Sequence, residues 1–113
     1  MERKTFQTNR DKALLVCLQR PGVSREPTEA QLNELALLLD TLGFETGGKT
    51  RVRLSAPQKK YLVGSGKAEE IIHRAGEEEC SVIVFDDDLS PSQQRNLEQL
   101  SGLCVIDRRE VIL

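Results

Sequence analysis

Short apolar runs alternate with stretches of helical periodicity along most of this chain, and this alternation limits its fold. Residues 13–18 and 103–106 are continuous apolar runs, and residues 81–85 are apolar after Ser81, which is the pattern of strands buried on both faces of a sheet. Helical stretches lie between and after these runs. Strands that alternate with helices form mostly parallel sheets with right-handed crossovers. The sequence therefore predicts an α/β fold, with a mostly parallel sheet of about four strands and helices on its faces.

Local signals mark where the helices begin. Thr28 and Gln31 have the spacing of a capping box, and Ser90 and Gln93 repeat it with a proline at the first helical position. Gly66 is expected to cap the helix between them. The leucines expected to pack inward are Leu32, Leu35, Leu39 and Leu42 in the first helix, and Leu97 and Leu100 in the third.

The length of 113 residues suits one hydrophobic core and is too short for two of ordinary size. Residues 13–113 are expected to form that domain, with residues 1–12 as an N-terminal extension. No apolar run approaches the roughly 20 residues that a membrane-spanning helix needs, and no signal-like segment follows the charged start. We therefore expect a cytoplasmic domain. Its closing helix is about one turn long, so we expect the natural protein to continue past Leu113.

Metal and disulfide chemistry are not indicated by the pattern of ligating residues. Cys17, Cys80 and Cys104 each lie in or beside an apolar run, and none forms a C-x-x-C pair. We expect them to be buried, reduced thiols. His73 is the only histidine and has no cysteine or histidine nearby in sequence, so no zinc site is expected.

Charge is distributed unevenly along the chain. Residues 46–68 contain six basic residues and no acid, whereas residues 69–88 contain eight acids and one arginine. The basic residues are Lys49, Arg51, Arg53, Lys59, Lys60 and Lys67. The first three alternate along an extended segment at residues 44–54 that two glycines interrupt, which places them on one strand face. A polyanion could contact this basic segment and would avoid the acidic one.

Residues 61–63 are a short apolar piece that is expected to be extended. It runs into Gly64-Ser-Gly-Lys67, a strand-to-helix turn that resembles the phosphate-binding loop of nucleotide hydrolases. The resemblance fails at Tyr61, where that loop needs glycine, and at Ala68, where it needs a hydroxyl for magnesium. Phosphate hydrolysis here is not expected. Three interpretations stay open: a degenerate nucleotide site, a polyanion contact, and a tight turn with a solvated lysine.

The strand at residues 81–85 ends in three aspartates. An apolar run followed by an aspartate holds magnesium in many nucleotide enzymes, but Asp87 and Asp88 also precede a helix, where negative charge is favoured. We favour the structural interpretation. The helix that follows is more polar than its leucines require, and its polar face is expected to be solvated; that face comprises Gln93, Gln94, Arg95 and Asn96.

Three segments together carry a family resemblance. Residues 61–71, 84–98 and 105–108 closely resemble the N-terminal domain of the HflX GTPases, and the likeness extends over roughly residues 13–113. The second segment, Val84-Phe-Asp-Asp-Asp-Leu-Ser-Pro-Ser-Gln-Gln-Arg-Asn-Leu-Glu98, is the most specific. The positions carried over from the family motif are Gly64, Gly66, Lys67, Asp86, Asp87, Ser90, Gln93, Gln94, Arg95 and Asn96.

The resemblance implies a larger protein, in which a long helical linker and a G domain follow this domain. GTP and Mg²⁺ would be bound by that G domain, and this chain would hold no cofactor and no catalytic residue. Proteins of this family bind the large (50S) ribosomal subunit and split or rescue ribosomes. The six basic residues would then contact phosphates of ribosomal RNA. Two alternatives remain: an ATP-binding domain that uses Lys67 for phosphate and Asp86 or Asp87 for magnesium, or a scaffold that packs on the G domain.

Overall fold

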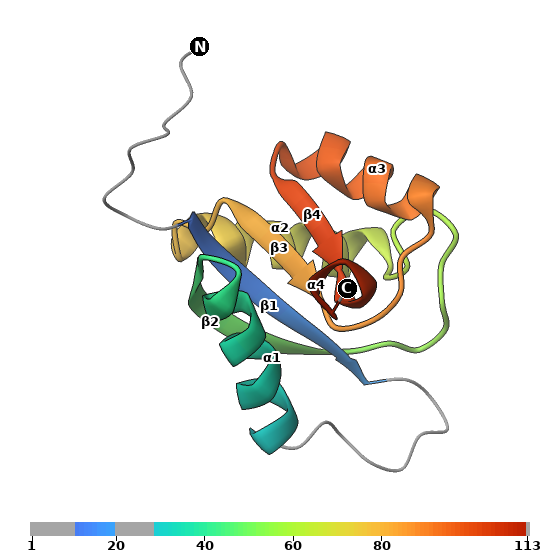
Figure 1. Ribbon diagram of the computed structural model, residues 1–113. Coiled ribbons are helices and arrows are strands. Elements are labelled where there is room, and N and C mark those ends of the chain that lie inside the picture. The colour runs from blue at the N-terminus through green and yellow to red at the C-terminus, as the bar shows by residue number, and fades with distance from the viewer. Residues whose placement is uncertain (1–10, 20–28, 113) are drawn as a thin grey trace.

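The structure, a computed structural model, describes residues 11–19 and 29–112. It confirms the predicted class, because four strands form one parallel sheet in the order β2-β1-β3-β4 with helices on both faces (Figure 1). The elements in chain order are β1 (Asp11–Gln19), α1 (Glu29–Thr41), β2 (Phe44–Arg53), α2 (Ser65–Glu77), β3 (Val82–Phe85), α3 (Pro91–Ser101), β4 (Cys104–Asp107) and α4 (Arg108–Ile112).

Successive residues of β1 point to opposite faces of the sheet and divide the core in two. Leu14 and Val16 pack in the cluster that includes residues of α2 and α3, and Leu15 and Cys17 pack in the cluster that includes residues of α1 and α4. All four side chains are buried. Figure 1 shows these helix pairs on opposite sides of the strands. The apolar run at residues 13–18 is therefore the centre of both layers.

The two glycines expected to interrupt the second strand lie within a continuous β2. The pairing of β1 with β2 shifts register between Ala13 and Leu14, so that Gly47 is the extra residue of a bulge. A Cβ atom at Gly47 would lie 2.7 Å from the Sγ of Cys80. Glycine is needed here because any side chain would collide with that sulfur.

The helix signals are confirmed at α3 and corrected at α2. The Ser90 hydroxyl accepts from the Gln93 amide while the Gln93 side chain accepts from the Ser90 amide, which completes the predicted capping box. At α2 the cap is Gly64, not Gly66, which lies in the first turn. A glycine cap offers no side-chain oxygen, so its position could not be read from the sequence. Thr28 lies outside the described residues.

Two further expectations about apolar residues are wrong. Leu42 and Leu100 are expected to pack inward, but 52% and 41% of their surfaces are exposed, because Leu42 follows the last residue of α1 and Leu100 lies in the last turn of α3. Residues 61–63 form only isolated bridges and no strand of the sheet. Leu62 has a φ of 71°, which closes a tight turn instead of continuing an extended segment.

The cysteines divide into two classes. Cys17 and Cys80 are buried, as expected, whereas Cys104 is exposed, so that part of the expectation is wrong. Cys104 is the first residue of β4, which lies at the edge of the sheet. Burial raises the pKa of Cys17 to about 12, with the nearby charge of Asp86 adding to the effect. Within the described residues, no helix is long and apolar enough to cross a bilayer.

We expect one thiol to react rapidly and two slowly with a disulfide reagent at pH 8. Desolvation raises the pKa of all three thiols, so the difference comes from access: Cys104 is exposed, whereas Cys17 and Cys80 are buried. Labelling followed by peptide mass spectrometry identifies the reacting residue. Rapid modification of Cys17 without denaturant would contradict the described packing, and Cys104→Ser should remove the rapid phase alone.

Candidate functional site

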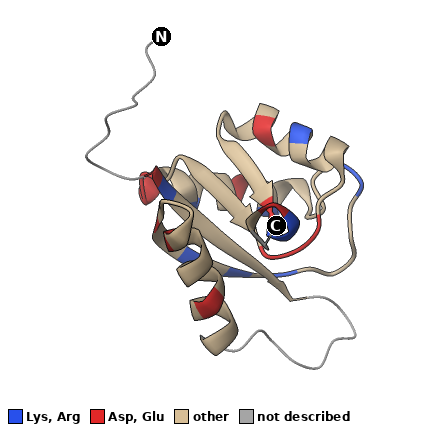
Figure 2. Cartoon of the chain, viewed as in Figure 1, with Lys and Arg blue, Asp and Glu red and all other residues tan. Residues whose placement is uncertain are grey.

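Three of the six predicted basic residues lie together on β2. Lys49, Arg51 and Arg53 alternate along the strand and share one face, as expected, and this face is the one toward α1. The Lys49 ammonium donates to the side-chain oxygen of Asn33 in α1 at 3.1 Å. Arg51 and Arg53 are exposed. β2 is an edge strand, so these side chains line one border of the sheet (Figure 2).

The next two basic residues lie in a tight turn of residues 58–62, which we call the basic turn. Two main-chain hydrogen bonds between Gln58 and Leu62, of 2.9 and 3.1 Å, close it. Lys59 and Lys60 occupy its exposed tip. The Lys60 ammonium lies 5.3 Å from the centre of the Tyr61 ring, within the range of a cation–π contact. The turn therefore presents two positive charges to solvent.

Side chains of α3 hold the basic turn in place. The side-chain amide of Gln93 donates to the main-chain carbonyl of Gln58 at 2.8 Å, and the side-chain amide of Asn96 donates to the main-chain carbonyl of Lys60 at 3.0 Å. Gln94 donates to the Val105 carbonyl at 2.6 Å. The expectation of a merely solvated polar face is therefore wrong for these three residues. Of the four positions in that face, Arg95 is exposed.

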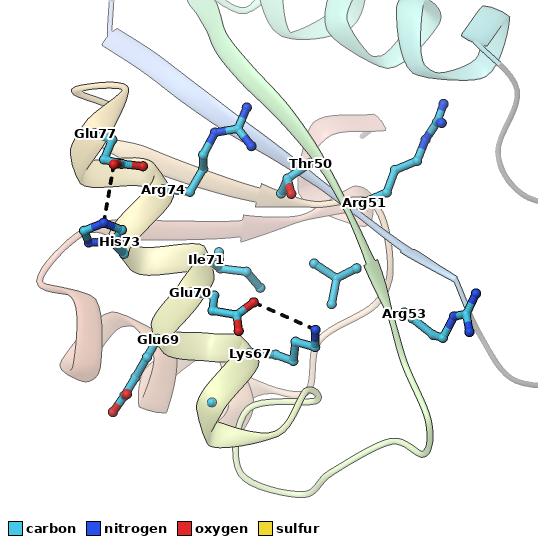
Figure 3. Close-up of a pocket in the computed structure, with 12 residues that line it drawn as sticks. Thr50, Arg51, Arg53, Lys67, Glu69, Glu70, Ile71, His73, Arg74 and Glu77 are labelled. Carbon is cyan, nitrogen blue, oxygen red and sulfur yellow. Dashed lines mark ion pairs between the residues drawn. The ribbon is translucent and has the colours of Figure 1, made fainter.

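The sixth residue, Lys67, lies apart from β2, in an open groove of about 650 Å³ between β2 and α2 (Figure 3). Its ammonium lies 3.8 Å from the Glu70 carboxylate, and His73 lies 3.4 Å from Glu77. The groove thus has cations and acids on its α2 wall. Its lining residues are Thr50, Arg51, Val52, Arg53, Gly66, Lys67, Glu69, Glu70, Ile71, His73, Arg74 and Glu77.

The residues near Lys67 do not fit a nucleoside triphosphate with magnesium. Ala68 is fully buried and has no hydroxyl to offer a metal ion. The groove lined by Lys67 is not lined by Asp86 or Asp87, the two carboxylates expected to serve it in the nucleotide interpretation. Asp86 instead lies 3.6 Å from the guanidinium of Arg108. No reaction step through a nucleotide follows from this arrangement.

Two of the aspartates that follow β3, Asp86 and Asp88, belong to an ion-pair network at the start of α4. Arg108 contacts Asp86, and Arg109 contacts Asp88 at 3.6 Å. Burial raises the pKa of Asp86, and the charge of Arg108 opposes that rise. Within the described part of the chain, no group of three acidic, histidine or cysteine side chains could hold a metal ion.

Asp107 is the buried centre of this network. Its carboxylate accepts hydrogen bonds from the Leu89 amide at 3.0 Å, from the Arg109 guanidinium at 2.9 Å and from the Glu110 amide at 3.2 Å. Burial alone would raise the pKa of Asp107, but the bonds from the Leu89 amide and the Arg109 guanidinium outweigh it and lower the pKa. The carboxylate therefore fastens the loop after β3 to the first turn of α4.

The fold defines the class first: a parallel α/β domain with helices on both faces. The cations of β2 and of the basic turn, Lys49, Arg51, Arg53, Lys59 and Lys60, form what we call its basic border. A solved GTP-binding protein from Sulfolobus solfataricus in complex with GDP has this fold, with a TM-score of 0.59 and 19% identity over 90% of this chain and 29% of that one. The SsGBP variant G235P gives a TM-score of 0.62 at 18% identity, over 90% of this chain and 31% of that one. At this identity the likeness concerns the fold alone.

Sequence comparison then gives the family. The family described as GTP-binding GTPase N-terminal matches residues 29–113. The chain is 40% identical to the GTPase HflX of Akkermansia muciniphila over 91% of its own length and 24% of that protein, and 43% identical to the Escherichia coli GTPase HflX over 73% and 19%. The chain belongs to the N-terminal domain family of the HflX GTPases. It spans about a quarter of the length of these curated relatives.

We expect Asp107→Asn to lower the free energy of unfolding by about 1 to 3 kcal/mol at pH 7, because hydrogen bonds to a charged group are lost. The folded-state pKa of Asp107 is lowered, so its stabilisation is present above its unfolded pKa and is lost as the pH falls through the folded value. The parent chain should therefore lose more stability than Asp107→Asn below about pH 4. Urea unfolding of the parent and the variant between pH 2 and 7 measures the loss of stability and its pH dependence.

Asp88→Asn is the control. It breaks only exposed ion pairs and should lower the free energy of unfolding by less than about 1 kcal/mol.

We expect the double variant Gln93→Ala and Asn96→Ala to loosen the basic turn without changing its charge. Each lost hydrogen bond is worth about 1 kcal/mol, so the amides of Gln58 and Leu62 should exchange with solvent roughly tenfold faster or more. Native-state hydrogen exchange measures this. Gln99→Ala, on the exposed side of α3, is the matched control. Equal exchange in all three proteins would show that α3 does not hold the turn.

Proposed function

We propose that this chain is the RNA-engaging N-terminal domain of a cytoplasmic HflX-type GTPase that acts on the large ribosomal subunit. In that protein a G domain outside this sequence would bind GTP and Mg²⁺ and hydrolyse the nucleotide. The domain itself would take no part in the chemistry, since its residues around Lys67 do not fit a triphosphate. Its task would be to place the GTPase on the ribosome during splitting or rescue.

The observation that carries the proposal is the basic border. The acid-free segment at residues 46–68 becomes an edge strand and a turn that follow each other along the chain, and both expose their cations. Figure 2 shows basic positions on β2 and, farther along the chain, on the loop at the right of the view. Duplex RNA displays rows of phosphates, and cations spaced along a strand and a turn can neutralise several of them at once.

The arrangement favours positioning over sequence reading. Arg51, Arg53, Lys59 and Lys60 are exposed cations that can reach phosphate oxygens. Lys49 contacts Asn33 and Lys67 contacts Glu70, and a phosphate would have to displace these contacts. α3 fixes the basic turn through main-chain carbonyls, which would reduce the ordering cost when an RNA surface binds.

We expect charge reversal of Arg51, Arg53, Lys59 and Lys60 to abolish retention of the chain on large ribosomal subunits at low salt. If two to four of these residues contact phosphates, the logarithm of the parent's binding constant should fall against the logarithm of the salt concentration with a slope of roughly −2 to −4. Co-sedimentation with purified subunits over a salt series measures both quantities.

A matched pair of single variants separates local contact from net charge. Arg53→Glu on β2 and Arg95→Glu on α3 change the same charge at exposed sites. Only Arg53→Glu should weaken retention and lower the salt slope. Equal retention of the quadruple variant and the parent, with unchanged circular dichroism, would refute the proposed role of the basic border.

A further inference from the structure

The pairing of β2 with β1 determines which main-chain N–H and C=O groups of β2 point outward, away from the sheet. Among the described residues the sheet pairs β2 with β1 alone. The Leu54 amide donates to the Gln19 carbonyl of β1 at 2.8 Å. Main-chain groups of successive strand residues point to opposite sides, so the N–H and C=O of Arg53 point away from β1. The same alternation turns the main chain of Lys49 outward.

In the amino-terminal half of β2, a side chain of α2 already occupies the outer edge. The Arg74 guanidinium of α2 donates to the outward carbonyl of Lys49 at 3.4 Å, and Glu78 holds the same guanidinium at 3.3 Å. The bulge at Gly47 interrupts regular pairing just before this point. An added strand could therefore pair only with the carboxyl-terminal half, around Arg53, which fixes its register.

The groove between β2 and α2 runs beside that half of the edge. Its volume of about 650 Å³ lies in the range of roughly 300–1,000 Å³ typical of ligand-binding pockets. Val52 and Ile71 are its apolar lining residues, and both are buried. Figure 3 shows the side chains of Arg51 and Arg53 directed away from α2, on the other face of β2. A strand beside β2 would thus meet Val52 and Ile71, together with the charged side chains of α2, on one face and two guanidinium groups on the other.

We propose that the outer edge of β2 binds an extended peptide segment that alternates acidic and apolar residues, which pairs as an added strand at Arg53. Main-chain hydrogen bonds would give affinity, and alternate side chains would give specificity. The acidic residues would face Arg51 and Arg53, and the apolar residues would cover Val52 and Ile71. A second copy of this chain is disfavoured as the occupant, because pairing β2 with β2 would set arginine against arginine.

This inference goes beyond the proposed RNA contact and can fail independently of it, although both use Arg53. An acidic strand on β2 would occupy the border where RNA phosphates are proposed to bind. The two ligands should therefore compete, so that an acidic segment of a partner protein would act as a regulator of ribosome binding.

The test uses a capped heptapeptide of alternating glutamate and valine, added to the chain and followed by hydrogen exchange. The peptide should slow exchange of the Arg53 amide at least tenfold. Two further peptides carry N-methyl groups on all glutamates or on all valines, which removes main-chain donors without changing charge. At least one of them should bind at least tenfold more weakly. Unchanged exchange at Arg53, or equal binding of all three peptides, overturns the proposal.

Variants at Arg53 separate main-chain pairing from charge. Arg53→Gln and Arg53→Pro both remove the guanidinium, but only proline removes the outward N–H, a change that an edge strand tolerates. Arg53→Pro should bind the peptide at least fivefold more weakly than Arg53→Gln, with circular dichroism confirming that both fold. Equal binding by the two folded variants overturns the proposal. Should the proline variant fail to fold, the N-methylated peptides decide the question.

Discussion

The burial of β1 on both faces is the constraint on which the rest of the structure depends. Ala13, Leu14, Leu15 and Val16 have no exposed surface, so both faces of the strand require helical cover. β2 and β3 pair with β1 on either side and in parallel, which requires a crossover helix between consecutive strands. One apolar run therefore determines the strand order, the two helical layers and the position of β2 at the border.

Polar side chains that hydrogen-bond to main-chain groups hold the loops of this framework in place. Gln93 and Asn96 fasten the basic turn to α3, and Asp107 fastens the loop after β3 to α4. Each bond satisfies a peptide group in a segment that has no strand or helix partner of its own. The loops therefore keep one arrangement although they contribute few buried apolar residues. The same bonds explain why the most specific segment of the family motif is polar.

The sequence was informative wherever a signal is local. The continuous apolar runs predicted β1, β3 and β4, the Ser90 capping box predicted the start of α3, and Gly102, with a φ of 71°, ends that helix as a glycine should. It was uninformative where the outcome depends on distant neighbours. The exposure of Leu100 and Cys104 depends on which parts of the folded chain lie around them, and Asn96 finds its acceptor 36 residues away. Periodicity detects a polar face but cannot show which carbonyl lies opposite it.

The basic residues of β2 reconcile two demands on an edge strand. An open edge invites pairing with any extended chain, and charges and bulges on edge strands limit that pairing. Here the bulge at Gly47 and the side chain of Arg74 prevent pairing along the amino-terminal half of β2. The charges of Arg51 and Arg53 limit pairing along the carboxyl-terminal half. Like-charged edges repel each other, so these arginines oppose self-association. The same charges attract phosphates or carboxylates, and an edge protected against its own copies thereby becomes selective for anionic partners.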